Sequence, residues 1–352
     1  MKQNYNRTIK LFFRTLFLII AGTSALLCQQ AGLQVSTYFD SNVREALTNT
    51  DQSLGFKLRG NLSHQVVNRN WLLEGSLLTQ TYIDAISPAQ SKLVVNSGLG
   101  LRYNLTPVIQ AAGVLDHFQK SFYEAGFSYR WIDYALVVYA QASSKFNLST
   151  RYSQRSTNYA TLDSIKFLDQ TLELRFGWRP GSRWLLEGLV AGKKITFHDY
   201  PAQGVVDDTA LASLSASQED RARTVQIHGR YHHRLILGTI VSYEAVTSNS
   251  VIGGYNLLSG RIYLSCRLGK DNMLHFIIQR VAKNYRRGDL SGVTAYRDPE
   301  ERIQNRTYLQ LERKINQSSI VYFQVSHLAN ETLLNQNYYN KTMLELGFKY
   351  KL

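Results

Sequence analysis

Two neighbouring acid–histidine pairs, Asp116–His117 and His198–Asp199, have the residue types of a general acid–base dyad. Asp116–His117 ends a stretch, 107–117, that is predicted to be a strand. Adjacent side chains of a strand point to opposite faces, so neither pair can act as a dyad by itself. The histidines also lack metal-ligand spacing. We therefore predict no catalytic site, no metal site and no cofactor.

A second set of candidate residues consists of charged side chains that recur at every second position. In "SLGFKLRGNLSH" (53–64), Lys57 and Arg59 alternate with apolar residues, which predicts a strand with one polar and one apolar face. The polar-face residues that we expect to line an interior are Lys57, Arg59, Glu74, Arg102, Glu124, Arg130, Glu173, Arg175, Glu187, Arg230, Arg261 and Arg267. Because basic groups prevail, a water-filled interior would concentrate anions. Alternatively, these charges mainly pair across neighbouring strands.

The alternation continues along most of the chain and predicts an all-β fold, since no useful length shows helical periodicity. About sixteen strands are expected. They are centred near 33–39, 53–64, 71–83, 92–105, 107–117, 121–131, 134–144, 168–178, 184–193, 223–232, 234–244, 257–268, 273–281, 304–313, 319–327 and 341–352.

The first 28 residues have the layout of a secretory signal, with a basic start followed by the apolar run "LFLIIAGTSALL" (16–27). We predict cleavage after Cys28, which leaves 29–352 as one domain; the alternative is a lipoprotein signal in which Cys28 is acylated. Beyond the signal only Cys266 remains, so an intramolecular disulfide is excluded. No further apolar stretch approaches the length of a membrane-spanning helix, but a closed barrel can cross a bilayer with half-apolar strands.

The predicted connections alternate in length. Short connections are expected at 66–70, 106–107, 132–133, 179–183, near His233, at 269–272 and at 315–319; long ones at 40–52, 145–167, 194–222, 245–256, 282–303 and 328–340. This alternation is typical of a closed antiparallel transmembrane barrel with short periplasmic turns and long extracellular loops. A soluble β-sandwich or propeller is the alternative architecture.

All four tryptophans, Trp71, Trp131, Trp178 and Trp184, flank predicted short turns on the apolar phase of their strands. Indole favours the boundary between lipid tails and headgroups, so we expect these four side chains to mark one membrane interface. A sandwich gives no reason to collect its tryptophans at one end. The pattern therefore favours the membrane barrel.

The longest predicted loop, 194–222, contains the acidic stretch "VVDDTALASLSASQED" (205–220). Sixteen strands leave an aqueous channel unless something fills it. One hypothesis is that 205–220 forms a short helix, folds inward and sets Asp207, Asp208, Glu219 and Asp220 near the basic wall as a constriction. The alternative is that this loop lies wholly outside.

The final stretch "KTMLELGFKYKL" (341–352) alternates at every second residue, with Leu344, Leu346, Phe348 and Tyr350 in one row. It resembles the terminal strand by which outer-membrane β-barrels of Gram-negative bacteria are folded, although those usually end on an aromatic residue and this chain ends on Leu352. The resemblance is architectural and identifies no subfamily. It implies an outer-membrane location, contact with lipid and lipopolysaccharide, and recognition of the last strand by the barrel-assembly machinery.

A porin-like passive channel for small, preferentially anionic solutes is the function that we expect. The alternative is an export or assembly barrel for surface polysaccharide or protein, which would stay closed without its partner. Nucleic acid is not an expected partner, because the arginines alternate with apolar residues instead of clustering with stacking platforms, despite the net charge of +14. The oligomeric state cannot be read from these patterns.

Overall fold

The computed structural model describes residues 30–41, 52–86, 91–122, 128–159, 166–207, 210–250, 254–285, 305–330 and 339–351. The predicted signal, 1–28, lies outside these ranges. The described residues form sixteen strands: β1 (Gln30–Asp40), β2 (Ser53–Val67), β3 (Trp71–Asp84), β4 (Lys92–Asn104), β5 (Ile109–Phe122), β6 (Tyr129–Gln141), β7 (Phe146–Tyr159), β8 (Lys166–Gly181), β9 (Trp184–Asp207), β10 (Ala210–His232), β11 (Leu235–Ser248), β12 (Tyr255–Leu268), β13 (Asn272–Tyr285), β14 (Asn305–Lys314), β15 (Ser319–Asn330) and β16 (Tyr339–Lys351).

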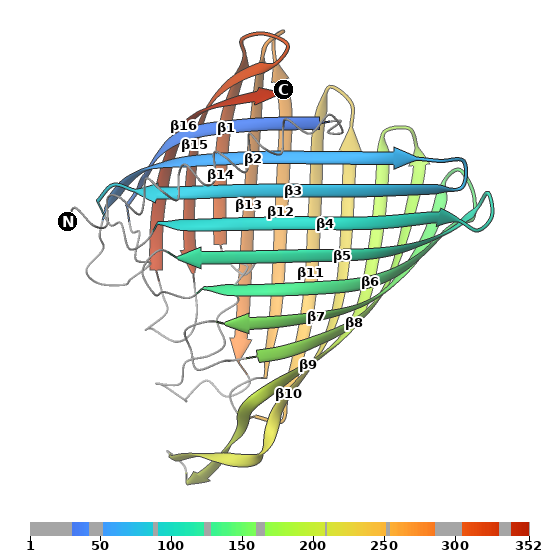
Figure 1. The fold of residues 1–352 in the computed structure, drawn as a ribbon, viewed down its shortest axis with the longest axis vertical. Helices are drawn as coiled ribbons and strands as arrows, with labels where there is room; N and C mark the ends of the chain where they lie inside the picture. Colours follow the sequence, from blue (N-terminus) through green and yellow to red (C-terminus); the bar gives the residue numbers. More distant parts are fainter. Residues whose placement is uncertain are drawn as a thin grey trace.

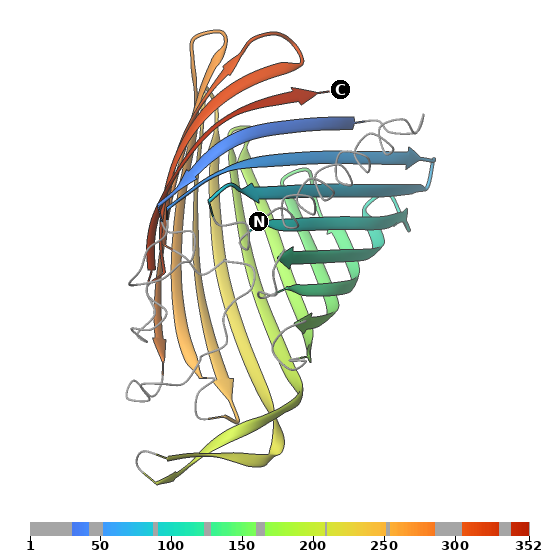
Figure 2. The same ribbon diagram turned by 60° about the vertical axis from the view of Figure 1, so that its left-hand side comes forward.

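The strands close into one barrel, in which every strand pairs antiparallel with its neighbours in the sequence and β1 pairs with β16 (Figures 1 and 2). Closure gives each described strand two hydrogen-bonded neighbours. Seven connections of two to four residues join the strands at one end of the barrel, here called the turn end. The start of β1 and the end of β16 lie at this same end; the opposite end is called the loop end. The predicted closed all-β barrel is confirmed.

The two faces of the wall follow from the alternation in the sequence. Leu136, Ile227 and Leu346 project outward and are 67%, 63% and 56% exposed, and many other large apolar side chains share their face. Side chains one position along each strand point into the interior and are mostly polar. Within the described ranges, no helix is long and apolar enough to cross a membrane.

Three predicted strands are corrected between residues 107 and 159. The sequence suggested strands at 107–117, 121–131 and 134–144 with a turn at 132–133; the structure has two longer strands, β5 and β6, and places the turn at 142–145. β7 then occupies the stretch predicted as the long loop 145–167. The outer half of β7, including Gln154 and Ser156, is polar on both faces. It therefore lacks the alternating apolar signal of a lipid-facing strand.

A second correction concerns the predicted loop 194–222. Most of it belongs to β9 and β10, which continue as a hairpin beyond the loop end of the wall (Figures 1 and 2). The predicted helix over 205–220 is wrong, because strand pairing such as Ala212 with Gly204 occupies this stretch. The register shifts near Ser213 and Ser217 mark irregularities that twist the hairpin.

Candidate functional site

The inward face of the wall is the candidate site. Strand registers place Lys57, Arg59, Glu74, Arg102, Glu173, Arg175, Glu187, Arg230, Arg261 and Arg267 on this face. The side chain of Arg130 instead takes the outward phase, next to Trp131 on the inward phase. Glu124 lies outside the described residues. Asp116 faces inward and His117 outward, so this pair forms no dyad, as the alternation predicts.

Several acidic side chains on this face are already paired. Glu74 receives a hydrogen bond from Arg102 at 3.3 Å, and Glu173 binds Arg175 with N–O distances of 3.1 and 2.7 Å. Glu187 contacts the ring nitrogen Nδ1 of His228 at 2.7 Å. The alternative that the charges pair across neighbouring strands therefore holds for Glu74 and Glu187, whereas Glu173 and Arg175 pair along the same strand, β8.

Some of the basic side chains on the inward face have no acidic partner among the described residues. Among the described residues, Arg59, Arg230 and Arg267 have no carboxylate within salt-bridge distance, and Arg261 is bound only by the neutral Gln279 at 2.8 and 2.5 Å. Since Glu74, Glu173 and Glu187 are held by partners while these guanidinium groups are not, this part of the inward face has an excess of positive charge. This imbalance is the electrostatic property of the site that bears on solutes.

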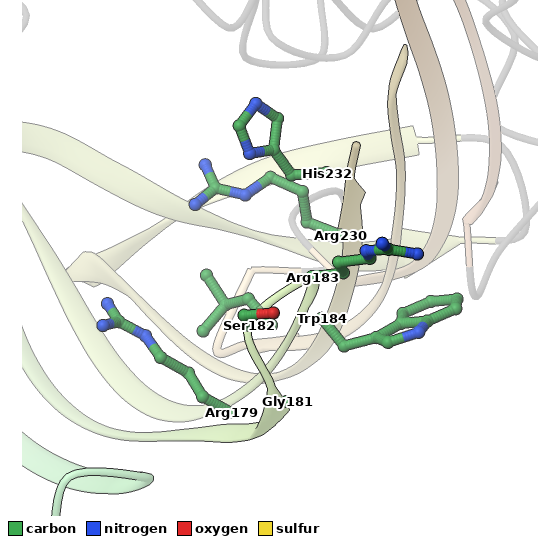
Figure 3. Close-up of a pocket in the computed structure, with 8 residues that line it drawn as sticks. Arg179, Gly181, Ser182, Arg183, Trp184, Arg230 and His232 are labelled. Atoms are coloured by element: carbon green, nitrogen blue, oxygen red, sulfur yellow. The ribbon is translucent and has the colours of Figure 1, made fainter. Parts of the chain in front are cut away.

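A basic pocket of about 360 Å³ lies at the turn end, where β8 and β9 meet β10. Its lining includes Arg179, Arg183, Arg230 and His232, with Trp184 beside it (Figure 3). The backbone there is fixed: the N–H of Arg179 donates to the Lys145 carbonyl, and the N–H of His232 donates to the Arg183 carbonyl, each at 2.8 Å. The cationic side chains therefore project from anchored strand ends.

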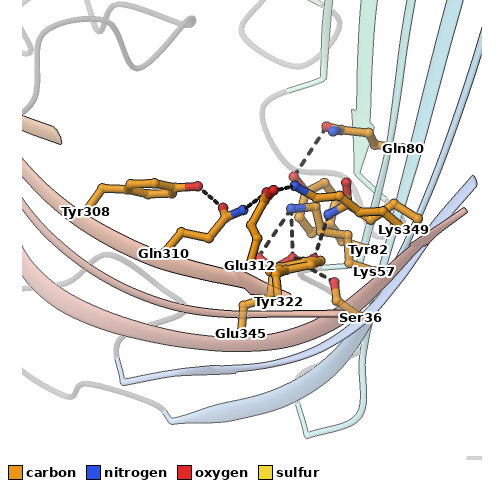
Figure 4. Close-up of polar contacts among 11 residues, drawn as sticks. Ser36, Lys57, Gln80, Tyr82, Tyr308, Gln310, Glu312, Tyr322, Glu345 and Lys349 are labelled. Atoms are coloured by element: carbon orange, nitrogen blue, oxygen red, sulfur yellow. Dashed lines mark hydrogen bonds and ion pairs between the residues drawn. The ribbon is translucent and has the colours of Figure 1, made fainter. Parts of the chain in front are cut away.

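A buried polar cluster spans β14, β15, β16, β1 and β2 (Figure 4). At its centre, Glu345 is 4% exposed and accepts a hydrogen bond from the Ser36 hydroxyl at 2.7 Å. The Tyr322 hydroxyl also donates to Glu345, and the Lys57 ammonium lies 3.3 Å from both carboxylate oxygens. Beside it, Lys349 binds Glu312 at 2.5 Å. We call Ser36, Lys57, Tyr322 and Glu345 the seam cluster.

A second buried cluster lies nearer the loop end, on β5, β6 and β7. Asp133 is 3% exposed and accepts a hydrogen bond from Arg151 at 2.8 Å, while Arg155 stacks over the Trp131 ring at 4.3 Å. Phe118 stacks on Trp131 from the other neighbouring strand, with ring centroids 5.5 Å apart. These contacts hold charged and aromatic side chains against the inside of the wall.

Three of the four tryptophans expected at one membrane interface take the outward phase, whereas Trp131 does not. Trp71, Trp178 and Trp184 lie at the turn end on the outward phase, and Trp178 and Trp184 are 47% and 51% exposed. Trp131 is 9% exposed, points inward and lies near the loop end. Both faces of β6 carry apolar residues, for example inward Val137 and outward Leu136. Alternation alone could not assign its phase.

The described backbone does not support the hypothesis that 205–220 folds inward as a constriction loop. Asp207 ends β9, and Glu219 and Asp220 lie in β10, so these residues belong to the hairpin strands and not to a loop folded across the interior. Asp208 lies outside the described residues. Glu219 binds Lys194 and Arg221 at 2.8 and 2.9 Å on the outward phase, whereas Asp220 is buried on the inward phase.

These features together decide the class of the molecule. A closed antiparallel wall has exposed apolar side chains outside, outward tryptophans at one boundary and charged side chains inside. Such a cylinder satisfies its backbone internally and presents a lipid-compatible surface. The chain is an antiparallel β-barrel of the transmembrane type.

Comparisons with known proteins find only distant similarities in fold. No protein-family model and no curated protein sequence matches this β-barrel. Its fold is similar to OmpT of Vibrio cholerae (12% identity, TM-score 0.49, covering 92% of this chain and 97% of that one). It is also similar to a bacterial polysaccharide outer membrane secretin (8%, 0.46, 92% and 98%) and to the siderophore receptor PirA of Pseudomonas aeruginosa (13%, 0.45). The match to PirA covers 91% of this chain but only 60% of the length of that receptor. At these identities and TM-scores, the matches carry no inference about solute or partner.

The sequence patterns did not reveal two histidine contacts on the inward face of the β-barrel. His275 contacts the Ser265 hydroxyl at 2.8 Å and Glu312 at 3.7 Å, so the residue types of a serine nucleophile, base and acid come together. Each comes from a different strand, which is why sequence spacing does not show them. Glu312 is also bound by Lys349, and the N–H groups of β12 and β13 lie in a paired ladder, so no oxyanion hole is evident there. Among the described residues, no group of His, Cys, Asp and Glu could hold a metal ion.

Proposed function

We propose that the β-barrel is a passive outer-membrane channel that favours small anionic solutes. The observation that carries this proposal is the unequal pairing of charges on the inward face: the acidic Glu74, Glu173 and Glu187 have partners, while Arg59 and Arg230 have no carboxylate partner among the described residues. Fixed positive charge beside water raises the local concentration of anions.

The architecture supports permeation through the middle of the barrel. All sixteen described strands belong to the wall, and none of them crosses the interior. A barrel of this strand number is wide enough for an aqueous channel, whereas an eight-stranded barrel is filled by its own side chains. The described hairpin β9–β10 continues away from the wall, so it offers no constriction (Figure 2).

Planar-bilayer recording tests this function. Under a potassium chloride gradient, we expect stable single-channel current steps. The sign of the reversal potential should show that chloride permeates more readily than potassium. The triple variant Arg59→Gln, Arg230→Gln, Arg267→Gln removes the uncompensated charges. It should lower the chloride-to-potassium permeability ratio by on the order of tenfold at low salt, and by less at high salt because ions screen the wall.

Arg130→Gln is a control for position. Arg130 lies on the outward phase, so this variant removes one positive charge without touching the interior. Its selectivity should equal that of the wild type. Cation-selective steps would overturn the proposal. A barrel that inserts but stays closed would also overturn it, and would instead fit an export or assembly barrel that needs a partner.

A further inference from the structure

The turn-end pocket has an unusual charge arrangement. Arg179, Arg183, Arg230 and His232 line it, and no carboxylate does. Among the described residues, none of the three arginines is in an ion pair, and the nearby Glu187 is held by His228 at 2.7 Å. Figure 3 shows the Arg179 and Arg230 side chains extending toward the same side of the turn, with Arg183 directed the other way, toward Trp184.

The surroundings reinforce the positive potential. Six further basic residues are exposed at the turn end, in or beside the other short connections: Arg69, Lys145, Arg234, Lys270, Lys314 and Lys351. Asp271 is the single acidic residue in the seven described turns. Anions near this rim are therefore attracted before they reach the pocket.

The local backbone fixes the strand ends that carry these arginines. "RPGSR" (179–183) forms the tight β8–β9 connection, with a register shift between Trp178 and Gly181 and pairing of Gly181 with Trp184. Arg230 pairs with Leu185 across the β9–β10 ladder. Trp184 packs on Tyr231 with ring centroids 4.9 Å apart on the outer surface. The pocket is thus formed by three strands whose backbones are held in place by pairing.

We propose that this pocket binds a phosphate group. Planar guanidinium groups bind phosphate oxygens through paired, charge-assisted hydrogen bonds, and the His232 ring adds a further donor. Two sources share this chemistry. One is a phosphate-bearing solute that crosses the barrel, which rests on the proposed channel function. The other is a phospholipid headgroup at the membrane boundary that Trp184 marks, which does not.

Calorimetric titration of the detergent-solubilised full chain with inorganic phosphate tests the pocket without requiring conduction. The variant Arg179→Gln, Arg230→Gln should weaken binding at least about tenfold, which corresponds to the loss of one good charge-assisted contact. The control Arg234→Gln, Lys270→Gln removes two charges from the same rim outside the pocket and should change affinity less than about twofold. Arg230→Lys, which keeps the charge but not the planar pair of donors, should fall between these two.

Two further measurements separate the sources. If soluble dihexanoyl phosphatidylglycerol competes for the pocket better than inorganic phosphate does, the ligand is the headgroup. If phosphate blocks the chloride current saturably in neutral-lipid bilayers, and blocks it less in the pocket variant, the ligand is the solute. Phosphate binding without any conductance supports the pocket and overturns the channel. Conductance with no phosphate or headgroup binding above that of the pocket variant overturns the pocket and leaves the channel intact. Gel mobility of the unheated barrel verifies that each variant is folded.

Discussion

Lys57 of β2 reaches past β1 to Glu345 of β16, with its ammonium 3.3 Å from both carboxylate oxygens. β1 and β16 are the first and last strands, so this ion pair crosses the seam at which the barrel closes. Gln34 of β1 donates to the Tyr322 hydroxyl at 2.6 Å and adds a second side-chain link across the seam. Closure therefore depends on buried polar side chains as well as on the backbone ladder.

Removing the charge of Glu345 should destabilise the barrel. Glu345→Gln keeps the shape of the side chain but leaves Lys57 without its carboxylate, and we expect a loss of about 2 kcal/mol in the free energy of unfolding. Urea titration in lipid vesicles, followed by loss of the compact electrophoretic form, measures this loss. Glu74→Gln is the control, because Glu74 and Arg102 are 37% and 46% exposed and should contribute less than about 1 kcal/mol. Equal losses in both variants would show that the seam cluster has no special role.

A methyl group at Gly347 should also disturb the seam. Gly347 lies directly opposite Tyr322, whose ring covers it, and a Cβ atom there would overlap that ring. Tyr322 is 1% exposed and bound to Glu345, so the ring cannot move aside easily. We expect Gly347→Ala to cost about 1–3 kcal/mol by overpacking. Gly113→Ala, where a Cβ would meet nothing within 4 Å, should stay within about 0.5 kcal/mol in the same urea titration.

The tryptophans should report opposite faces of the wall. In single-tryptophan variants in vesicles, fluorescence of Trp178 and Trp184 should be quenched strongly by lipids brominated near the headgroup, because both indoles face outward at the turn end. Trp131, which is 9% exposed inside the barrel, should be quenched weakly by the same lipids. Strong quenching of Trp131 would contradict the inward phase of β6.

Shortening the β9–β10 hairpin should leave conduction unchanged. Replacing 199–216 by an Asn-Gly turn removes the hairpin beyond the wall, and Thr196 and Glu219 remain paired. Single-channel conductance should match the wild type within the scatter of individual channels. A clear increase in conductance would mean that the removed segment narrows the channel, and would restore the constriction hypothesis.

Much of the fold could be predicted because a membrane wall imposes strict alternation. β2, β4, β12 and β16 each carry an apolar outward row against a polar inward row, and their strands were placed within a few residues. The prediction failed where this contrast is absent. β6 has apolar residues on both faces, so alternation places Arg130 and Trp131 on the wrong sides, and the polar outer half of β7 has the composition of a loop.

The inward face was harder to predict than the fold. Phase alone assigned Lys57 and Arg230 to the interior side, but not their partners, because those lie on other strands. Lys57 meets a residue 288 positions away, and the basic pocket joins residues of β8, β9 and β10. Such contacts depend on the register of strand pairing. A shift of the register by two residues keeps every side chain on the same face, so hydrophobic periodicity does not determine the register.

The hydroxyl of Ser36 and the carboxylate of Glu345 are separated by 309 positions. The hydrogen bond between them closes a loop of this length, so the loss of chain entropy on bringing β1 and β16 together must be overcome before the bond can form. Fourteen strands separate β1 from β16 along the chain, although these two strands are neighbours in the barrel. A folding intermediate that lacks this contact would keep an open margin able to pair with other chains, and the step that joins Ser36 to Glu345 would end that vulnerability.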